Sequence, residues 1–377
     1  MKYLKTGLVG CGFPFFFHTA DAETSKYIKY TAVFDIDYEK ACDVAESFSA
    51  NKMTPYKTLD AMLTSDIEAV IVSVPHFLHE DVVIKCMNAG KHVLCEKPMA
   101  ITVEGCRLMI EAAKRNKVRL MIAENHRFLP AHNWIHDAIK KGLIGEVMLV
   151  RSYEGCNELD ALEDVGSWKM DMKKSGGGAF LDQAVHKFAA LEYMLGDRVD
   201  SVTTILGKQY TVLPEKAEDN AISIVTFKSG ILCEITVSCT QINNATNSLE
   251  IYGTKGTIME CHDNENPVRI YSMADEAGDM QGEWDIPEIQ HGENPTYYFI
   301  SGRNEDDHFA QCILQKKEFE FTPEDAMSAV ECCLTGYLSF VEQRPVKRDE
   351  VLKIAETYAG TKSIMKRLEG KIPTRTK

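Results

Sequence analysis

The segment Gly7-Leu-Val-Gly10-Cys-Gly12-Phe-Pro-Phe15 decides the fold expected for this chain. It closes an apolar run that begins at Tyr3 and is typical of a first β-strand. Gly10 permits a tight turn after the strand, and Gly12 lets backbone N–H groups approach a pyrophosphate at the N-terminus of the next helix. Phe15 replaces the third glycine of the dinucleotide-binding motif, so we expect the helix to lie farther from the strand. Taken alone, the two glycines fit an ordinary turn as well as a nucleotide site.

An acidic residue at the end of the second predicted strand favours the nucleotide site. Asp35 follows the apolar residues Ala-Val-Phe, close to the offset of about 20 residues expected of a ribose-binding acid. Its carboxylate can accept hydrogen bonds from both ribose hydroxyls and would repel a 2′-phosphate, and Ile36 offers such a phosphate no positive charge. The sequence therefore predicts NAD rather than NADP. Asp35 could instead cap the helix expected from Tyr38 to Phe48, although Asp37 is better placed for that role.

Short apolar runs alternate with helical patterns up to residue 123, which is typical of a parallel sheet covered by helices on both faces. The expected strands are Tyr3 to Val9, Tyr30 to Phe34, Ala69 to Val74, His92 to Leu94 and Val118 to Ala123. The segment from Phe77 to Asn88 has helical spacing and is followed by the stop residue Gly90. This rhythm predicts an α/β fold whose residues 1–124 form a doubly wound Rossmann domain.

The remaining residues, 125–377, are expected to form a second α/β domain. We expect a helix from Pro130 to Lys141, a strand from Val147 to Tyr153, and a helix after the glycines at 176–178. Turn residues separate three further strands, which predicts an antiparallel sheet built from Ala221 to Phe227, Ile231 to Ser238 and Asn247 to Tyr252. The stretch from Asp263 to Asp307 is acidic and loop-like. Helices are expected over 323–342 and 349–369, and these C-terminal helices could pack back on the first domain.

Composition excludes several classes of partner. The chain has 377 residues, enough for two domains, and a net charge of −14 that repels nucleic acid backbones and anionic lipid. No segment approaches the ~20 apolar residues that a membrane-spanning helix needs. The twelve cysteines are scattered without a CxxC pair, and the N-terminus does not resemble a signal peptide. We therefore expect a cytoplasmic protein with reduced thiols and no metal site.

A lysine follows the fourth predicted strand of the first domain. Glu96-Lys97-Pro98 lies at the carboxyl end of that strand, where open α/β sheets bind their ligands. The Lys97 ammonium could hold a substrate hydroxyl and stabilise a developing alkoxide. Considered by itself, a Lys-Pro step is more often an exposed turn.

A second group of chemical interest follows the three glycines at 176–178. Asp182 and His186 stand four residues apart on the predicted helix, which places them on one face and within reach of each other. Apolar neighbours, including Leu181 and Val185, indicate partial burial. A carboxylate beside an imidazole raises its basicity and orients it, as a general base requires. An ordinary surface pair would have the same spacing.

Together these motifs resemble the glucose-fructose oxidoreductase and inositol dehydrogenase (Gfo/Idh/MocA) family over nearly the whole chain. The resemblance rests on Gly10-Cys-Gly12, Asp35, Ser73-Val-Pro75 with His79, Ala89-Gly90-Lys-His-Val-Leu-Cys-Glu96-Lys97-Pro98, Asn125-His-Arg127-Phe128-Leu-Pro130, Ser167-Trp168-Lys169, the Asp182/His186 helix, Tyr252-Gly253-Thr-Lys-Gly256-Thr and Thr322-Pro-Glu-Asp325.

The resemblance implies a Rossmann domain, then an α/β domain whose large open sheet mediates homodimer or higher homo-oligomer contacts. It implies Lys97, Asp182 and His186 as the catalytic residues. The positions expected to bind NAD are Gly10, Gly12, Phe13, Asp35, Ser73, Pro75, His76, His79, Glu96, Lys97 and Asn125. Two departures from the family pattern are Phe15 and the pair Gln183-Ala184, which stands where many members have a small or apolar residue followed by glycine.

Other candidate sites are less specific. His76 and His79 stand three apart but lack a nearby cysteine or carboxylate, so they fit cofactor-loop residues better than metal ligands. The run Glu305-Asp306-Asp307-His308 is expected to be a solvated acidic loop rather than a cation site. The phenylalanines at 13, 15, 16 and 17 are expected to pack the first helix against the second domain.

The expected activity is NAD-dependent oxidation of a secondary hydroxyl on a carbohydrate, with a pyranose or glycoside oxidised at C3 as the expected substrate. Arg127, Tyr153 and Trp168 are the predicted substrate residues, and further aromatic rings suited to stacking on sugars are Trp134, Trp284, Tyr297 and Tyr298. Three alternatives stay open: an inositol or polyol dehydrogenase, a redox-assisted glycoside-cleaving enzyme with no net NADH, and a catalytically silent NAD-binding regulator.

Overall fold

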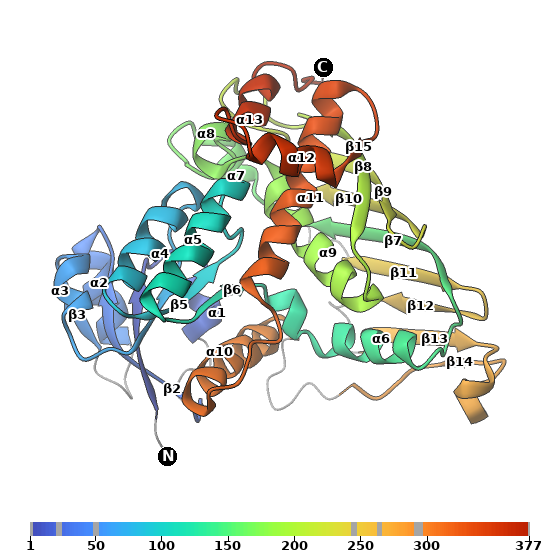
Figure 1. The fold of residues 1–377 in the computed structure, drawn as a ribbon, viewed down its shortest axis with the longest axis horizontal. Helices are drawn as coiled ribbons and strands as arrows, with labels where there is room; N and C mark the ends of the chain where they lie inside the picture. The colour runs from blue at the N-terminus through green and yellow to red at the C-terminus, as the bar shows by residue number, and fades with distance from the viewer. Residues whose placement is uncertain are drawn as a thin grey trace. The chain divides into compact units, whose positions relative to one another are not determined.

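The computed structural model describes residues 3–19, 25–47, 53–242, 247–261, 266–289 and 297–375, without the side chains of residues 15, 16, 280, 297 and 298. The chain forms two compact units, coloured along the sequence in Figure 1. Unit 1 comprises Met1–Ala100, Glu104–Asn125 and Phe299–Met327, and unit 2 comprises Ile101–Val103, His126–Tyr298 and Ser328–Lys377. The division into functional domains at residues 1–124 and 125–377 stays a prediction.

Unit 1 contains a six-stranded parallel sheet with the strand order β3-β2-β1-β4-β5-β6. The strands are β1 (Leu4–Val9), β2 (Ile28–Phe34), β3 (Thr54–Tyr56), β4 (Ala69–Val72), β5 (His92–Glu96) and β6 (Leu120–Ala123). Every residue of β4 and β6 is buried, as expected when helices cover both faces of a parallel sheet. The order reverses between β1 and β4, and such switch points bind ligands at the carboxyl ends of the strands.

The helices of this part of the chain follow the predicted alternation. They are α1 (Phe15–Thr19), α2 (Tyr38–Ser47), α3 (Leu59–Leu63), α4 (His79–Asn88), α5 (Val103–Asn116) and α10 (Tyr297–Gln315), with short 3₁₀ helices η1 (His76–Leu78) and η2 (Asn125–Phe128). The expected helix to Phe48 ends at Ser47 among the described residues. The Rossmann fold predicted for this part of the sequence is confirmed.

Helix α10 corrects the expectation for the acidic stretch from Asp263 to Asp307. Its charged run is not a solvated loop, because Glu305 and Asp306 are 2% and 5% exposed within the helix. Tyr30 of β2 donates a hydrogen bond from its hydroxyl to Asp306 Oδ2 at 2.9 Å. Hydrogen-bond partners within unit 1 therefore stabilise the burial of side chains for which the sequence predicts exposure to solvent.

Unit 2 contains a nine-stranded, mostly antiparallel sheet in the order β14-β13-β12-β11-β7-β10-β9-β8-β15. The strands are β7 (Val147–Gly155), β8 (Val199–Gly207), β9 (Asn220–Phe227), β10 (Leu232–Ser238), β11 (Ser248–Gly253), β12 (Gly256–Glu260), β13 (Val268–Ser272), β14 (Trp284–Asp285) and β15 (Val346–Lys347). Strands β9 and β10 form the predicted hairpin, and β7 and β10 pair in parallel. The second α/β domain with an antiparallel sheet is confirmed.

Helix α9 (Ala179–Leu195) packs on one face of this sheet, against β7, β9 and β10 (Figure 1). The other helices of the region are α6 (Pro130–Lys140), α7 (Leu159–Glu163), α8 (Met172–Ser175), α11 (Pro323–Glu342), α12 (Arg348–Ala355) and α13 (Lys362–Leu368), with the 3₁₀ helix η3 (Asp275–Met280). The helix expected over 349–369 is in fact two helices, because the turn residues from Glu356 to Thr361 interrupt it. No described helix is long and apolar enough to cross a membrane.

Candidate active site

The glycine turn after β1 has the geometry of a dinucleotide site. Gly10 has φ +95°, and a Cβ there would lie 2.1 Å from the carbonyl oxygen of Ser73, so only glycine fits. A Cβ at Gly12 would meet nothing closer than 3.8 Å within the protein. Gly12 is therefore not required by internal packing, which fits a backbone that a ligand approaches closely.

Ser73 follows β4 at the switch point of the sheet and faces the same turn. Its backbone N–H donates to Val9 O at 2.8 Å, while its Oγ is buried without a hydrogen-bond partner among the described residues. Buried hydroxyls normally have partners. An orphaned Oγ beside a glycine turn fits contact with a bound nucleotide.

Asp35 lies at the end of β2, where the sequence places it. Its carboxylate accepts hydrogen bonds from the N–H groups of Cys11 and Asp37, both at 2.8 Å. These bonds fix the carboxylate beside the glycine turn, and Ile36 next to it is almost fully exposed. The arrangement suits a ribose diol and offers no cation to a 2′-phosphate.

The phenylalanines near the turn are only partly described. Phe13 is largely exposed, and its ring meets Phe17 edge-on with centroids 5.3 Å apart. Phe17 in turn lies 5.5 Å from Phe299 of α10, within unit 1. The side chains of Phe15 and Phe16 lie outside the described residues, so the predicted effect of Phe15 on the helix stays a prediction.

The loop after β4 is tied to the Lys97–Pro98 step through His79. Its ring nitrogens lie 2.8 Å from the carbonyl oxygen of Pro98 and 2.9 Å from that of Val74. Burial lowers the pKa of His79 despite these carbonyl oxygens. His76 is also buried, with its ring 5.6 Å from that of His79. Together with Pro75, which precedes η1, these residues shape the loop.

Glu96 anchors the strand end that carries Lys97. Glu96 Oε2 accepts a hydrogen bond from the Lys97 backbone N–H at 3.1 Å, and Oε1 lies 3.1 Å from His18 Nε2. His18 is buried on α1, and its other nitrogen lies 2.8 Å from Asp306 Oδ1. Although burial opposes it, the two carboxylates raise the pKa of His18 well above its usual range. Lys97 is half-buried and its peptide bond to Pro98 is cis.

The same cluster contains a possible cation site. Ligand atoms of His18, Glu305 and Asp306 lie within 4.8 Å of one another. Burial raises the pKa of Glu305 well above its usual range. Both nitrogens of His18 already face carboxylates, which favours a structural network over a metal site. Asn125, at the end of the same unit, donates to Ser301 Oγ at 3.1 Å.

In unit 2, a buried carboxylate caps the helix that carries Asp182 and His186. Glu218 Oε1 accepts hydrogen bonds from the N–H groups of Gly178 and Phe180, both at 3.0 Å, and from the Tyr337 hydroxyl at 2.7 Å. Burial raises the pKa of Glu218 to about 7, although these donors oppose the shift. A Cβ on Gly178 would lie 1.9 Å from Glu218 O, so glycine is needed for this close approach.

Asp182 and His186 both lie in the first half of α9 and are 5% and 4% exposed. The His186 ring stacks on that of His126, with centroids 4.4 Å apart and planes inclined by 19°. His126 belongs to the same unit and is fully buried. The imidazole of His186, the predicted base, is therefore buried and stacked against a neighbouring ring.

Lys169 supplies the cation near Asp182. Its Nζ lies 3.7 Å from Asp182 Oδ2 and makes a close ion pair with Glu158. Burial lowers the pKa of Lys169, but Asp182 and Glu158 raise it above its ordinary value, so the ammonium is retained. Gln183 Nε2 donates to Asp182 Oδ2 at 2.8 Å. Gln183, one of the two departures from the family pattern, therefore contacts Asp182 directly.

The predicted substrate residues have mixed positions in unit 2. Arg127 is buried, donates to Asn133 Oδ1 at 2.7 Å and covers the Tyr193 ring at 3.6 Å. Tyr153 alternates with Glu154 on β7, and Glu154 pairs with Lys187 of α9 at 2.6 Å, so Tyr153 faces away from α9. Trp168 is half-buried next to Lys169. A substrate role for these three residues stays a prediction.

The other aromatic candidates do not form one surface. Trp284 packs on Tyr271 with centroids 5.7 Å apart, and Trp134 is half-buried on α6. The side chains of Tyr297 and Tyr298 lie outside the described residues.

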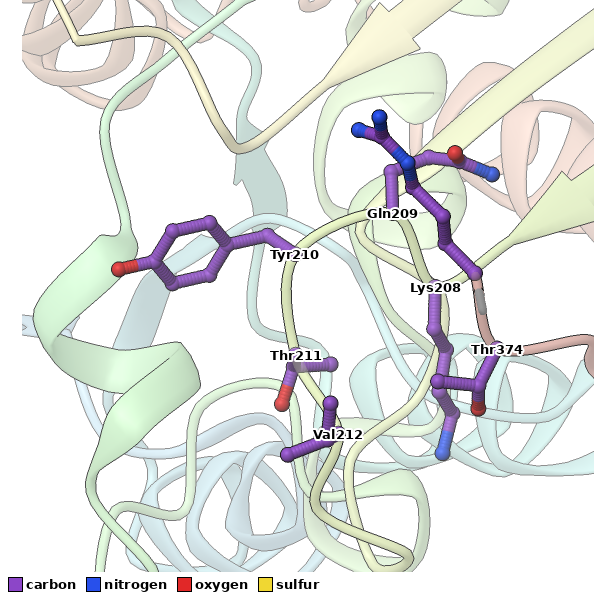
Figure 2. Close-up of a pocket in the computed structure, with 7 residues that line it drawn as sticks. Lys208, Gln209, Tyr210, Thr211, Val212 and Thr374 are labelled. Carbon is purple, nitrogen blue, oxygen red and sulfur yellow. The ribbon is translucent and has the colours of Figure 1, made fainter. Parts of the chain in front are cut away.

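A surface cavity of about 290 Å³ lies elsewhere in unit 2, where the C-terminal segment pairs with residues after β8. Figure 2 shows Lys208, Thr211, Val212 and Thr374 around it, with the Tyr210 ring turned away. Lys208 Nζ donates to the carbonyl oxygens of Leu213 and Pro214, both at 3.2 Å. None of the predicted site residues lines this cavity, so we assign it no part in the chemistry.

Sequence reasoning missed four residues that surround the predicted groups. Lys169 and His126 appear in the motifs of the sequence, but no spacing indicated their contact with Asp182 or His186. Glu158 and Glu218 had no local signal, since one follows a strand and the other precedes one. Only the fold of unit 2 brings them to α9.

Two family models match successive parts of the chain. A family model described as "Oxidoreductase family, NAD-binding Rossmann fold" matches residues 4–124, and one described as "GFO/IDH/MocA C-terminal domain" matches residues 132–259. Myo-inositol 2-dehydrogenase of Thermotoga maritima is 26% identical over 93% of this chain and 100% of its own. Levoglucosan dehydrogenase of Pseudarthrobacter phenanthrenivorans is 26% identical over 74% of this chain and 78% of its own.

Solved structures agree on the fold. A levoglucosan dehydrogenase in complex with NADH and levoglucosan has a TM-score of 0.81 and 21% identity, covering 92% of this chain and 99% of that chain. GenD2 from gentamicin A biosynthesis, in complex with NAD, has a TM-score of 0.77 and 24% identity, covering 92% of this chain and 97% of that chain.

Proposed function

We propose, from the premise that this chain belongs to the Gfo/Idh/MocA family of NAD-binding oxidoreductases, that it oxidises a secondary ring hydroxyl of a pyranose or its glycoside at C3. The observation that carries the proposal is the enclosed pair on α9, where Asp182 has the Lys169 ammonium 3.7 Å away and His186 is held against His126. Relatives named as sugar and inositol dehydrogenases support the class of substrate.

The cofactor residues of the proposal are those of unit 1. Gly10, Gly12 and the Ser73 hydroxyl would hold the pyrophosphate side of NAD, and Asp35 the adenosine ribose. NAD supplies the hydride acceptor when bound. Phe13, Pro75, His76, His79, Glu96 and Asn125 complete the proposed cofactor set. Among them, the buried His79 and the hydrogen-bonded Glu96 act by fixing the loops on either side.

Each catalytic residue has one proposed task. His186 accepts the proton of the substrate hydroxyl, and Asp182 stabilises the imidazolium that results. Lys97 donates a hydrogen bond to the oxygen and stabilises its developing negative charge. The carbon loses a hydride as the oxygen loses its proton, which leaves a ketone.

Lys169 extends this assignment. Its ammonium lies 3.7 Å from Asp182 Oδ2, and a positive charge at this distance favours the ionised form of a carboxylate. An ionised Asp182 is what a developing imidazolium on His186 requires.

An assay of the purified protein with NAD and a panel of glucose, glucosides and inositols tests the proposal. NADH formation with a glucoside, and a 3-keto product by NMR or mass spectrometry, is the expected result. Efficient oxidation of free inositols with glucose and glucosides inert would overturn the pyranose assignment. Product release from a glycoside without net NADH would support the redox-assisted cleavage alternative, and no cofactor change with any substrate would support the silent regulator.

The open face of the nine-stranded sheet is the proposed contact between copies of the chain. Strand register places the exposed residues Leu149, Leu232, Ile222, Ile224 and Ile205 on the face away from α9. Apolar side chains on an exposed sheet face are typical of an interface. Light scattering should give the mass of a dimer or a higher oligomer. The proposal includes a cytoplasmic location, which the twelve cysteines, all present as thiols rather than disulfides, support.

A further inference from the structure

Two cysteines of unit 2 meet at the ends of neighbouring parallel strands. The Sγ atoms of Cys156 and Cys239 are 3.5 Å apart. Gly155 of β7 pairs with Ser238 of β10, so the cysteines form the next cross-strand pair. Hydrogen bonds keep this pairing beyond the strands, since Cys156 N–H donates to Ser238 O at 2.9 Å and Glu158 N–H donates to Cys239 O at 3.0 Å.

This placement suits a disulfide. Paired strands lie about 4.8 Å apart, and disulfides join Cα atoms about 4.4–6.8 Å apart with a sulfur–sulfur bond of about 2.05 Å. The two sulfur atoms would therefore have to approach by roughly 1.5 Å, which side-chain rotation and a small backbone shift can supply. No strand has to leave its neighbour.

The surroundings of the two thiols favour reaction at Cys156. Cys156 is half-buried, whereas Cys239 is buried. The contact with Cys156 and burial raise the pKa of Cys239 well above its usual range, while the Lys169 ammonium acts in the opposite direction. Lys169 lies near Cys156 as well. A partly exposed thiol beside a lysine is the setting in which cysteines become reactive.

We infer that Cys156 and Cys239 are a modification site, at which hydrogen peroxide converts two thiols into one intramolecular disulfide. The Cys156 thiolate attacks one peroxide oxygen, the O–O bond breaks, and the products are a sulfenic acid and water. The Cys239 sulfur then attacks Cys156 Sγ, forming the S–S bond as the S–O bond breaks and a second water leaves. The two thiols lose two electrons and two protons, and the peroxide is reduced to two waters.

The disulfide would change the surroundings of Asp182. The charges of both Asp182 and Lys169 influence Cys239, so these side chains lie beside the thiols. Drawing the ends of β7 and β10 together would displace Lys169 from Asp182, and turnover should fall tenfold or more. Only this effect on turnover rests on the proposed function, because disulfide formation is measured without a substrate.

The experiment oxidises the full, reduced protein with hydrogen peroxide and analyses it by thiol titration and mass spectrometry. We expect the loss of two thiols, a mass lower by about 2 Da, and a single linked peptide pair containing Cys156 and Cys239. Dithiothreitol should restore both thiols. Cys156→Ser and Cys239→Ser should each abolish the link, whereas Cys261→Ser, which removes another half-buried cysteine of unit 2, should retain it.

Three results would overturn the inference. These are unchanged thiols after oxidation, a link between other cysteines, and conversion of Cys156 to a sulfinic acid while Cys239 stays a thiol. If the link forms but turnover with the confirmed substrate is unchanged, the modification stands and its effect on Asp182 is wrong. If no substrate is found, the link alone decides the inference, and the proposed function fails separately.

Discussion

The candidate residues of the two units are held in different ways. In unit 1 the functional groups follow strand ends and are held by backbone hydrogen bonds, as Asp35 is by Cys11 and Asp37. In unit 2 they lie on a helix and are surrounded by buried ionisable groups, among them Lys169 and Glu218. A cofactor that many proteins share can be bound by a standard turn, whereas the acid–base chemistry depends on charges specific to this fold. The following experiments test that contrast.

The largest effects on turnover should come from one residue of each unit. Lys97→Met and His186→Asn should each lower kcat about a hundredfold or more, since acid–base and electrostatic groups supply that much. NAD affinity, measured by fluorescence titration, should survive in the His186 variant. Near-normal turnover of His186→Asn on a confirmed substrate would contradict the base assignment.

Two glycines in unit 1 should separate folding from cofactor binding. Gly10→Ala should cost more than about 2 kcal/mol of unfolding free energy, because its Cβ clashes with a backbone oxygen. Gly12→Ala should fold normally and weaken NAD binding tenfold or more. Gly90→Ala is the control for strain alone, since its φ is +76° with no atom within 4 Å. Equal stability losses at Gly10 and Gly90 would show that the clash is unimportant.

In unit 2, Lys169 should prove to be a positioning residue. Lys169→Met should lower kcat about tenfold with little change in KM, a typical cost of losing one charge partner of a catalytic group. It should also move the acid limb of the pH–rate profile to higher pH, because Asp182 then protonates more readily. Lys169→Arg keeps the charge and should restore most of the profile. A purely structural role would instead lower stability in both variants and leave the profile in place.

A further effect, seen only in the pH dependence of stability, concerns the cap of α9. The raised pKa of Glu218, about 7, means that the folded protein holds a proton that the unfolded chain releases above about pH 4.5. The stability from this group is complete below pH 4.5 and is lost as the pH rises to 7, by about 3 kcal/mol at most. Urea unfolding at pH 5 and pH 8 should therefore show a smaller decline for Glu218→Gln than for the natural protein. Parallel declines would mean that Glu218 is ionised throughout.

The same contrast explains what the sequence could predict. The turn at Gly10, the acid at Asp35 and the spacing of Asp182 and His186 are local patterns, so their elements could be located without a structure. The charge beside Asp182 comes from Lys169 in the loop before α9, and Lys169 pairs in turn with Glu158. No periodicity in the sequence indicates such contacts. The aromatic character of Tyr153 suggested a substrate role, which stays a prediction, and strand alternation turns this side chain away from α9.

The acidic run in α10 was also beyond local reasoning. Four polar residues in succession are typical of a solvated segment. The hydroxyl of Tyr30 and the imidazole of His18 contact Asp306, and the Ser25 hydroxyl donates to Asp307, which makes burial of the run favourable. The apolar face of α10 is not interrupted by this run, since Ile300, Phe309 and Ala310 are buried with it.

Because α10 belongs to unit 1, this unit can be completed only late in biosynthesis. A ribosome releases the six strands of the parallel sheet early, but Asp306 and Gly302, which contact Tyr30 and Phe17, are translated well over a hundred residues later. The nascent nucleotide-binding unit must therefore wait, incomplete, while β7 to β14, eight of the nine strands of the other sheet, are synthesised. During that interval, polar groups that are buried and paired in the complete protein would be exposed to chaperones. A fragment cut after residue 125 would be fixed permanently in this unfinished state.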